Sequence, residues 1–284
     1  MDLIDQGWTD IQIHRLKELN ATTDDLRDGF TGKDDRNRAF QALEKHLVRK
    51  ERERLSQLLD HRFQPQRCRL ESNLIAALNH EGFTQVTTPT IISQNDLCRM
   101  SIDKKHPLND QIYWVDSRHC LRPMLAPNLY RLMKDLVRIR SGEPIRIFEI
   151  GSCFRKETDG ARHIGEFTML NLVEMKMPMD ARKLRMQNLA TLVMKAADID
   201  AYKLIRESSE VYDETIDIVC GPGELEVASC AMGPHLLDDA WEIVDTWVGL
   251  GFGLERLLMA REGSHGIGKW SRSLAYIDGI RLTL

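Results

Sequence analysis

The chain has 284 residues, of which 42% are hydrophobic and 29% are charged, and its formal net charge is −4. This composition is typical of a globular protein and excludes a disordered chain, a collagen-like fibre and a small disulfide-rich scaffold. The six cysteines are scattered without a CxxC pair or a nearby histidine at metal-ligand spacing, so we expect no zinc site and a reducing compartment. The first ten residues lack the pattern of a secretory signal, and no apolar stretch reaches 18 residues, so we expect a cytoplasmic protein that does not span a membrane.

The charge is distributed unevenly along the chain. Residues 33–69 contain eleven Lys or Arg against six Asp or Glu, a local charge of +5, so the remainder sums to −9. Such a segment is typical either of a solvated helix with mixed charges or of a surface that faces a polyanion such as a nucleic-acid backbone. Charge alone does not decide between these two interpretations.

Residues 1–62 predict a small helical appendage. Thr9 and Gln12 have the spacing of a capping box at the start of a first helix. A turn rich in Thr, Asp and Gly follows, and a second, mostly basic helix begins near Asp35 and ends before Pro65. The apolar faces of the two helices consist of Ile13, Leu16, Leu19, Phe40, Leu43 and Leu47.

Residues 63–284 predict a larger domain in which helices and strands are mixed. An amphipathic helix runs from Leu70 to Leu78, and Gly82 stands where a helix C-cap glycine belongs. Further helices are expected at residues 127–137, 180–197 and 254–261. Strands are expected at residues 83–88, 112–115, 145–150, 153–156, 167–174, 202–206, 215–219, 225–229 and 248–251. Because many strands follow one another directly, the pattern predicts an α+β fold with an antiparallel sheet rather than a doubly wound sheet.

Three common nucleotide motifs are missing or incomplete. The chain contains no G-x-x-x-x-G-K-[ST] phosphate loop. The string that starts at Gly249 has Leu254 where a dinucleotide fingerprint needs its third glycine. His163–Glu166 resembles the HIGH signature of class I aminoacyl-tRNA synthetases, but the lysine that would answer it, Lys176, follows only 13 residues later. A class I synthetase is therefore not the interpretation that we favour.

Three separated segments carry the chemistry. The first, Gly82–Pro89, reads as a helix cap followed by a strand that ends at proline; the second consists of Phe154–Glu157, a turn and His163–Phe167. The third is the glycine-rich string Gly249–Arg256. In this order and spacing they resemble motifs 1, 2 and 3 of the class II aminoacyl-tRNA synthetases.

The physical chemistry of these segments agrees with that resemblance. Alternate glycines let a nucleotide approach the backbone of a strand directly. Arg256 follows them at the start of a helix, where a planar guanidinium can hold phosphate oxygens in bidentate fashion. Arg155 and Glu157 are two residues apart on an expected strand, so both side chains should face one side of the sheet.

Longer strings narrow the resemblance to the pyrrolysyl-tRNA synthetases. They are LRPMLAPNLY at Leu121–Tyr130, IFEIG at Ile147–Gly151, EFTMLN at Glu166–Asn171 and WVG at Trp247–Gly249. The likeness covers most of residues 8–284. We expect the chain to differ from the long archaeal form in lacking a fused N-terminal tRNA-binding domain. This expectation suits a bacterial catalytic subunit with a separate tRNA-binding polypeptide, or an archaeal form that has no such domain.

The resemblance implies a role for each residue of an ATP site. Arg155 would bind the α-phosphate and the substrate carboxylate, and Glu157 would bind the adenine. Phe167 would stack on the adenine, while His163 would lie near the terminal phosphates. Arg256 would sandwich the base and reach the γ-phosphate. Arg155 and Arg256 are thus the expected catalytic residues.

ATP as substrate and Mg²⁺ as metal are the ligands that the resemblance implies. Glu226 and Ser229 would help to hold Mg²⁺, an ion that favours oxygen ligands and needs few protein contacts when phosphates supply the rest. Without the resemblance, Glu226 would be interpreted as a salt-bridged strand residue.

The resemblance also implies an apolar amino-acid pocket sized for a methylpyrroline ring. Asn171 would donate a hydrogen bond to the side-chain carbonyl of the substrate, and Tyr212, in the loop at residues 210–214, would close over the ring. The other residues expected at this pocket are Ala126, Leu129, Tyr130, Met133, Val173, Trp247 and Gly249. Without the resemblance, Leu129, Tyr130 and Met133 would be read as the core-facing side of a helix.

The implied activity is the activation of pyrrolysine by ATP and its transfer to the 3′ end of the cognate, amber-decoding tRNA. The expected partners are that tRNA, a second copy of the chain in a homodimer and a separate small tRNA-binding protein. Candidate contacts to tRNA phosphates in the appendage are Arg36, Arg38, Lys45, Arg49, Lys50 and Arg52. Two alternatives stay open: a class II synthetase for another lysine-like or aromatic amino acid, and a non-catalytic tRNA-binding paralogue.

Overall fold

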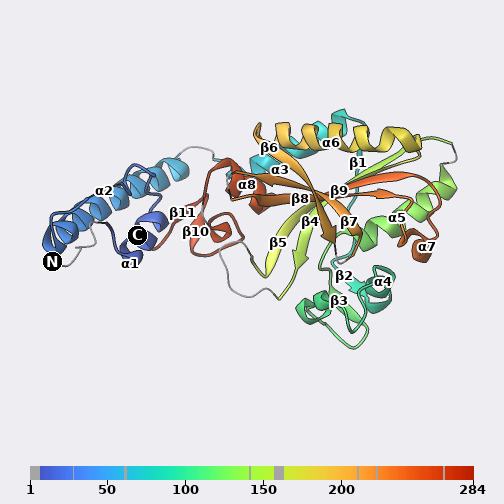
Figure 1. The fold of residues 1–284 in the computed structure, drawn as a ribbon, viewed down its shortest axis with the longest axis horizontal. Helices are drawn as coiled ribbons and strands as arrows, with labels where there is room; N and C mark the ends of the chain where they lie inside the picture. The colour runs from blue at the N-terminus through green and yellow to red at the C-terminus, as the bar shows by residue number, and fades with distance from the viewer. Residues whose placement is uncertain are drawn as a thin grey trace. The chain divides into compact units, whose positions relative to one another are not determined.

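The computed structural model describes residues 7–27, 29–60, 63–140, 142–156, 163–209, 211–221, 223–264 and 266–284 (Figure 1). The chain forms two compact units. One contains Met1–Pro65 together with Gly268–Leu284, and the other contains Gln66–Ile267. No helix of the described residues is both long enough and apolar enough to cross a membrane.

The smaller unit is built around helices α1 (Asp10–Glu18) and α2 (Lys33–Asp60). The capping box predicted at the start of α1 is confirmed, with Thr9 and Gln12 each accepting a backbone hydrogen bond from the other residue. The two helices share a small core of buried side chains made of Trp8, Leu16, Leu19, Phe30 and Leu47.

The C-terminal segment completes this smaller unit. It contains a short antiparallel pair, β10 (Tyr276–Ile277) and β11 (Ile280–Arg281). Lys269 Nζ donates hydrogen bonds to the Asn20 side chain at 2.6 Å and to a backbone oxygen of α1 at 2.7 Å. Asn20 in turn donates to the backbone oxygen of Gly279. Segments near the two ends of the chain are therefore joined by partly buried polar contacts.

The larger unit is built on a seven-stranded sheet with the strand order β1-β4-β5-β9-β8-β7-β6. Its strands are β1 (Thr84–Gln85), β4 (Ile145–Phe154), β5 (Glu166–Met175), β6 (Tyr202–Ser209), β7 (Asp213–Cys220), β8 (Leu225–Gly233) and β9 (Trp247–Gly253). Strand β1 pairs in parallel with β4, and every other neighbouring pair is antiparallel. The predicted α+β class with an antiparallel sheet is confirmed.

Helices cover the two faces of this sheet differently (Figure 1). Helices α3 (Gln66–His80), α6 (Arg182–Ala196) and α8 (Leu254–Arg261) pack on one face, against side chains such as Phe148, Leu172 and Leu250, which are at most 1% exposed. Helix α5 (Ala126–Ile139) packs against β4 and against the short helix α7 (Asp238–Trp241).

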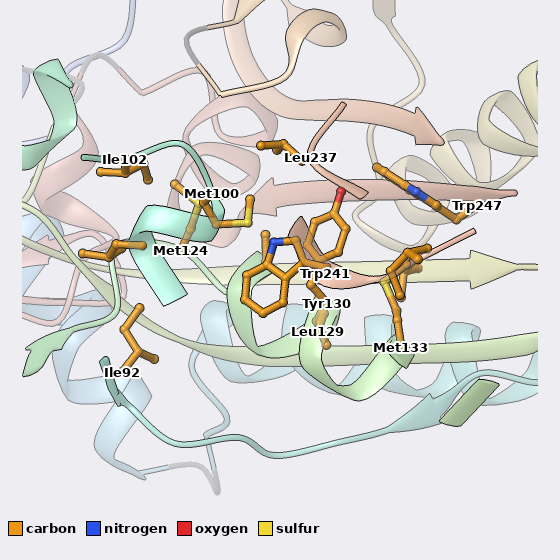
Figure 2. Close-up of a cluster of buried hydrophobic side chains, with 14 of the residues drawn as sticks. Ile92, Met100, Ile102, Met124, Leu129, Tyr130, Met133, Leu237, Trp241 and Trp247 are labelled. Carbon is orange, nitrogen blue, oxygen red and sulfur yellow. The ribbon is translucent and has the colours of Figure 1, made fainter. Parts of the chain in front are cut away.

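A separate hydrophobic cluster joins α5 and α7 to the second face of the sheet. Figure 2 shows Tyr130, Trp241 and Trp247 within it, and the rings of Tyr130 and Trp241 are stacked with centroids 5.5 Å apart. The cluster continues into α4 (Gln94–Arg99) and the two-stranded sheet of β2 (Ile91–Ser93) and β3 (His119–Leu121). Short 3₁₀ turns lie at Pro107–Gln111, Met179–Ala181 and Ile267–Lys269.

The predicted end of helix α3 is confirmed. Gly82 has φ +86°, and Phe83 N–H donates to Leu78 O while Gly82 N–H donates to Asn79 O. These two bonds form a Schellman motif, in which a glycine adopts the left-handed conformation at lowest cost.

The strand predicted at residues 112–115 is wrong. Only Trp114 forms an isolated bridge, to Cys120, and Tyr113, Trp114 and Val115 are 37–55% exposed. Val115 N–H and Leu121 N–H instead bond within a tight hairpin, to His119 O and Tyr113 O. Beyond the buried Ile112, the run lacks the buried face that would have extended it into a sheet.

Candidate active site

A cavity of about 380 Å³ opens over the face of the sheet that α3, α6 and α8 leave uncovered. Every residue predicted to bind ATP or the amino acid lines it, except Glu157, which lies outside the described residues. They are Ala126, Leu129, Tyr130, Met133, Arg155, His163, Phe167, Asn171, Val173, Tyr212, Glu226, Ser229, Trp247, Gly249 and Arg256. The structure therefore brings both predicted sets together in one place.

The strand register explains why these residues meet. Asn171 on β5 pairs with Gly251 on β9, which pairs with Ser229 on β8. Directly paired residues of neighbouring strands project to the same face, and residues two apart on a strand also share a face. Phe167, Met169 and Val173 therefore lie on the same side as Asn171, which is the cavity side.

The glycines of β9 leave bare backbone in the floor of the cavity. A Cβ atom at Gly249 would lie 3.1 Å from the Trp247 ring, and one at Gly251 would lie 3.2 Å from the Asn171 side-chain oxygen. Neither glycine has a positive φ, so the requirement is for space and not for backbone conformation. A flat ligand can thus lie against the strand itself, as the sequence predicted.

A β-bulge places Glu226 and Ser229 on the same face of β8. Regular alternation would put residues three apart on opposite faces. However, Ala228 pairs with Ile218 and Glu226 pairs with Val219, so one extra residue, Val227, is inserted between them. The extra residue brings Glu226 back to the face of Ser229, and both residues line the cavity.

These two oxygen donors fit Mg²⁺ in the role that the resemblance implies. The described residues contain no group of three or more His, Cys, Asp or Glu that could hold a metal by themselves. A metal at Glu226 and Ser229 would therefore take most of its ligands from phosphates and water, as Mg²⁺ commonly does. The neighbouring cation is Arg256, whose Nη1 lies 3.2 Å from the Glu226 carboxylate.

Motif 2 holds its arginine against an aromatic ring. The Arg155 Nε–H donates to Pro123 O at 3.0 Å, and the guanidinium carbon lies 5.3 Å from the centroid of Phe167. The backbone N–H of Arg155 donates to Gly165 O, which closes the strand pair at the cavity rim. These contacts fix the guanidinium beside the ring that is expected to stack on the base.

Helix α5 and strand β9 supply aromatic walls to one end of the cavity. The Tyr130 and Trp247 rings meet edge to face at 5.7 Å, and Tyr212 lies 6.5 Å from Trp247 in a similar arrangement. Met133 and Val173 add apolar surface between them. Burial raises the pKa of the Tyr130 and Tyr212 hydroxyls, so both stay neutral at physiological pH.

Asn171 is the polar group of this apolar end. Its side-chain oxygen is buried and has no hydrogen-bond partner among the described residues. A buried polar atom without a partner costs roughly 1–3 kcal/mol, so a ligand that bonds to this amide gains that much more. The oxygen therefore calls for a donor such as a substrate N–H, while the nitrogen of the same amide is the atom that would donate to a substrate carbonyl, as the resemblance implies.

Some cavity residues were not predicted from the sequence. Met169 and Ala231 lie two residues from Asn171 and Ser229 on the same strands, so strand alternation could have identified both. Asp238 is different, because it lies behind the pocket wall and bonds to Trp247 and Tyr130. No local pattern in the sequence indicates this contact.

The predicted tRNA-contact residues separate into two groups on α2. At 100° per residue, four of them fall within an arc of about 60°, opposite the buried Leu47. This group, which we call the basic stripe, consists of Arg38, Lys45, Arg49 and Arg52, all exposed. Arg36 is half-buried and donates to Gly7 O, and Lys50 lies about 120° away from the stripe, near Asp25.

Comparison with known proteins agrees with this geometry. Residues 58–274 match the family described as "tRNA synthetases class II core domain (F)". The crystal structure of the pyrrolysyl-tRNA synthetase from Desulfitobacterium hafniense is 50% identical and covers 99% of this chain and 100% of its own, with a TM-score of 0.91. A second structure of that synthetase is 48% identical over 100% of this chain and 98% of its own, with a TM-score of 0.89.

More distant likeness extends to other class II enzymes. The proline–tRNA ligase of Methanopyrus kandleri is 24% identical over 163 residues, which are 53% of this chain. The chain spans 30% of the length of that curated relative. The family match over most of the chain and the near-complete alignment at 50% identity agree. The chain belongs to the class II aminoacyl-tRNA synthetases and, within them, to the pyrrolysyl-tRNA synthetase family.

Proposed function

We propose that this protein activates pyrrolysine with ATP and transfers it to the 3′ end of its cognate tRNA. The observation that carries the proposal is the unpartnered oxygen of the Asn171 amide, a hydrogen-bond acceptor inside an aromatic and aliphatic pocket, next to a glycine-lined strand and two arginines. A long apolar side chain that ends in an amide and a small ring fits this combination.

The residues of the chain would act mainly by positioning and by stabilising charge. Arg155 would hold the substrate carboxylate and the α-phosphate together, so that a carboxylate oxygen attacks the α-phosphorus in line and pyrophosphate leaves. Phe167 would fix the adenine, and Arg256 would bind the outer phosphates. Groups that are preorganised in this way contribute most of the rate enhancement in such transfers.

Mg²⁺ would be held by Glu226 and Ser229 together with phosphate oxygens, and when bound it would neutralise charge on the phosphates. The hydroxyl of the terminal tRNA ribose would then attack the carbonyl carbon of the adenylate, which forms the ester, breaks the bond to the phosphate and releases AMP and a proton. We assign no general base.

The apolar end of the pocket supports a preference for pyrrolysine over lysine. Burying about five additional ring carbons at about 0.8 kcal/mol each favours the larger side chain by roughly 4 kcal/mol. No described carboxylate lines the surface formed by Leu129, Met133 and Val173, so the ammonium of lysine would be desolvated there without a partner.

Amino-acid-dependent pyrophosphate exchange tests the proposal. Pyrrolysine should drive exchange, while lysine, phenylalanine and proline should not. Arg155→Ala should lower the rate with pyrrolysine roughly 10²–10³-fold, which is the scale for losing one preorganised charge stabiliser. If lysine drove exchange as well as pyrrolysine does, the proposed substrate would be wrong. If exchange were unchanged in Arg155→Ala, the role proposed for motif 2 would be wrong.

The partners that we propose follow from the family and from the basic stripe. We propose that the stripe contacts tRNA phosphates, that the protein works as a homodimer in the cytoplasm, and that a separate small tRNA-binding polypeptide can assist it. Light scattering tests the dimer, since the chain mass is 32.7 kDa and a dimer would have twice that mass. A mass of one chain at assay concentration would contradict it.

A further inference from the structure

Asp238, at the start of α7, is a buried carboxylate that the proposed reaction does not use. The residue is 2% exposed, and no lysine or arginine of the described residues forms an ion pair with it. Burial raises the pKa of this carboxyl above its usual value. A buried acid without a cation is costly, so its neutral hydrogen-bond partners must offset the loss of solvation.

Those partners are the walls of the amino-acid pocket. The Trp247 indole N–H donates to both carboxylate oxygens of Asp238, at 3.0 and 2.9 Å, and the Tyr130 hydroxyl lies 3.3 Å from one of them. The rings of Trp247 and Tyr130 meet edge to face, at 83° between their planes. One carboxylate thus contacts the polar atoms of two rings that both line the pocket.

His235 connects Asp238 to Tyr212, a third residue that lines the pocket. Its backbone N–H donates to Asp238 at 2.7 Å. The ring accepts a hydrogen bond from Leu237 N–H at Nδ1, so Nε2 carries the proton and donates to Tyr212 O at 2.8 Å. The place of Tyr212, which is expected to close over the substrate ring, therefore depends on the same short segment.

We propose that Asp238 is a positioning residue for the amino-acid pocket: it orients Trp247 and Tyr130 directly, holds Tyr212 through His235, and so sets the affinity and selectivity for a long side chain. The inference rests on the proposed function for the identity of the amino acid. Its physical basis is that a rigid ring keeps its orientation only when its polar atom is fixed, and displacements near 1 Å change binding and rate strongly.

The test compares three variants of adjacent acids. Asp238→Ala removes every acceptor, Asp238→Asn keeps an oxygen for Trp247 and an amide that can donate to the Tyr130 hydroxyl, and Asp239→Ala deletes the exposed neighbour on the same helix. We expect Asp238→Ala to raise the KM for the amino acid roughly 10- to 100-fold while the KM for ATP stays within about 3-fold. Asp238→Asn and Asp239→Ala should stay within about 3-fold of wild type in both constants.

Two further measurements keep the test decisive. Near-ultraviolet circular dichroism should change in Asp238→Ala and not in Asp239→Ala, because it reports on the surroundings of aromatic rings independently of activity. Should Asp238→Ala not fold, Asp238→Glu keeps the charge but shifts it by one methylene, and it should show the same selective rise in the amino-acid KM.

The outcomes separate this inference from the proposed function. The kinetic assays use whichever amino acid the wild-type protein activates. If that amino acid is not pyrrolysine, the proposed substrate is wrong, but the KM of each variant can still be compared with that of the wild type. An unchanged amino-acid KM in a folded Asp238→Ala or Asp238→Glu protein would overturn the positioning role. A parallel rise of the KM values for the amino acid and ATP would also overturn it, because it would indicate general damage to the fold.

Discussion

Arg256 Nη1 lies 3.2 Å from a carboxylate oxygen of Glu226 and 3.2 Å from its backbone oxygen. The Glu226 side chain is 48% exposed and that of Arg256 is 25% exposed, so water screens the pair and its contribution to stability is small. A weak pair of this kind can exchange partners at low cost. Phosphate oxygens can then bind the Arg256 guanidinium while a cation binds the Glu226 carboxylate.

The first prediction concerns Glu226→Gln. The variant keeps the shape of the side chain but removes the charge that attracts a divalent cation. Half-maximal pyrophosphate exchange should then require roughly tenfold more free Mg²⁺, which corresponds to about 1.4 kcal/mol. Titration of Mg²⁺ at constant ATP measures this shift, and unfolding by urea should show little change in stability.

Glu224→Gln is the matched control for that experiment. Glu224 precedes β8, is exposed and pairs with Lys203 at 3.6 Å, and it does not line the cavity. Its Mg²⁺ dependence should equal that of wild type. Identical titrations of Glu226→Gln and wild type would exclude Glu226 from the metal site.

The β-bulge at Val227 is a feature of the site that could not be predicted from the sequence pattern. Alternation along β5 and β9 correctly places Asn171, Gly249 and Gly251 on one face, because side chains of a regular strand repeat every two residues. The same rule applied to β8 would separate Glu226 from Ser229. Only the resemblance paired them, since an inserted residue leaves no mark in composition or hydrophobic pattern.

Contacts between distant parts of the chain could not be predicted from the sequence either. Capping at Thr9 and Gly82 is local and was predicted from two or three residues. The bond from Lys269 to Asn20 spans 249 residues, and Asp238 meets Tyr130 across 108 residues. Partners this far apart are selected by tertiary packing, which no periodicity in a single sequence records.

The second prediction concerns the side-chain amide of Asn171. In Asn171→Ala the preference for pyrrolysine over lysine, measured as the ratio of kcat/KM values, should fall roughly 3- to 10-fold. This is the effect of losing one hydrogen bond worth about 0.5–1.5 kcal/mol. Asn171→Leu, which restores volume without the amide, should lose at least as much preference. Full recovery of the preference in Asn171→Leu would show that volume, and not the amide, discriminates.

A third prediction concerns alkaline stability and Cys153. Burial raises the pKa of this thiol to about 12, against about 8.5 for an ordinary cysteine. Between these values only the unfolded chain releases the proton, so the free energy of unfolding falls as pH rises above about 9, by up to about 1.4 kcal/mol per pH unit. Cys153→Ala should reduce this slope by about that amount in urea titrations at pH 8, 9 and 10.

Cys98→Ala serves as the control for the alkaline slope, because Cys98 is exposed while Cys153 is buried. Its slope should match that of wild type. If Cys153→Ala and wild type lost stability in parallel between pH 9 and pH 10, ionisation of Cys153 could not be the cause of the alkaline loss.

The final prediction concerns the basic stripe on α2. Its first and last members, Arg38 and Arg52, are 14 residues apart, which is about 21 Å of helix and enough to follow several phosphates along a strand. Each phosphate contact contributes about 0.7–0.9 to the slope of log K against log salt. Lys45→Ala and Arg49→Ala should each flatten the slope of tRNA binding by that amount, while pyrophosphate exchange stays near wild type.

Point substitutions are a cleaner test here than removal of the appendage. Residues 268–284 pack against α1 and α2, so deleting residues 1–62 would expose partners such as Leu284 and Lys269. Lys50→Ala is the matched control, since Lys50 is exposed on the same helix but faces away from the stripe, towards Asp25. Because it removes the same charge as Lys45→Ala, equal flattening by both would mean that net charge, and not the stripe, governs binding. No flattening in Lys45→Ala or Arg49→Ala would remove the stripe from the tRNA interface.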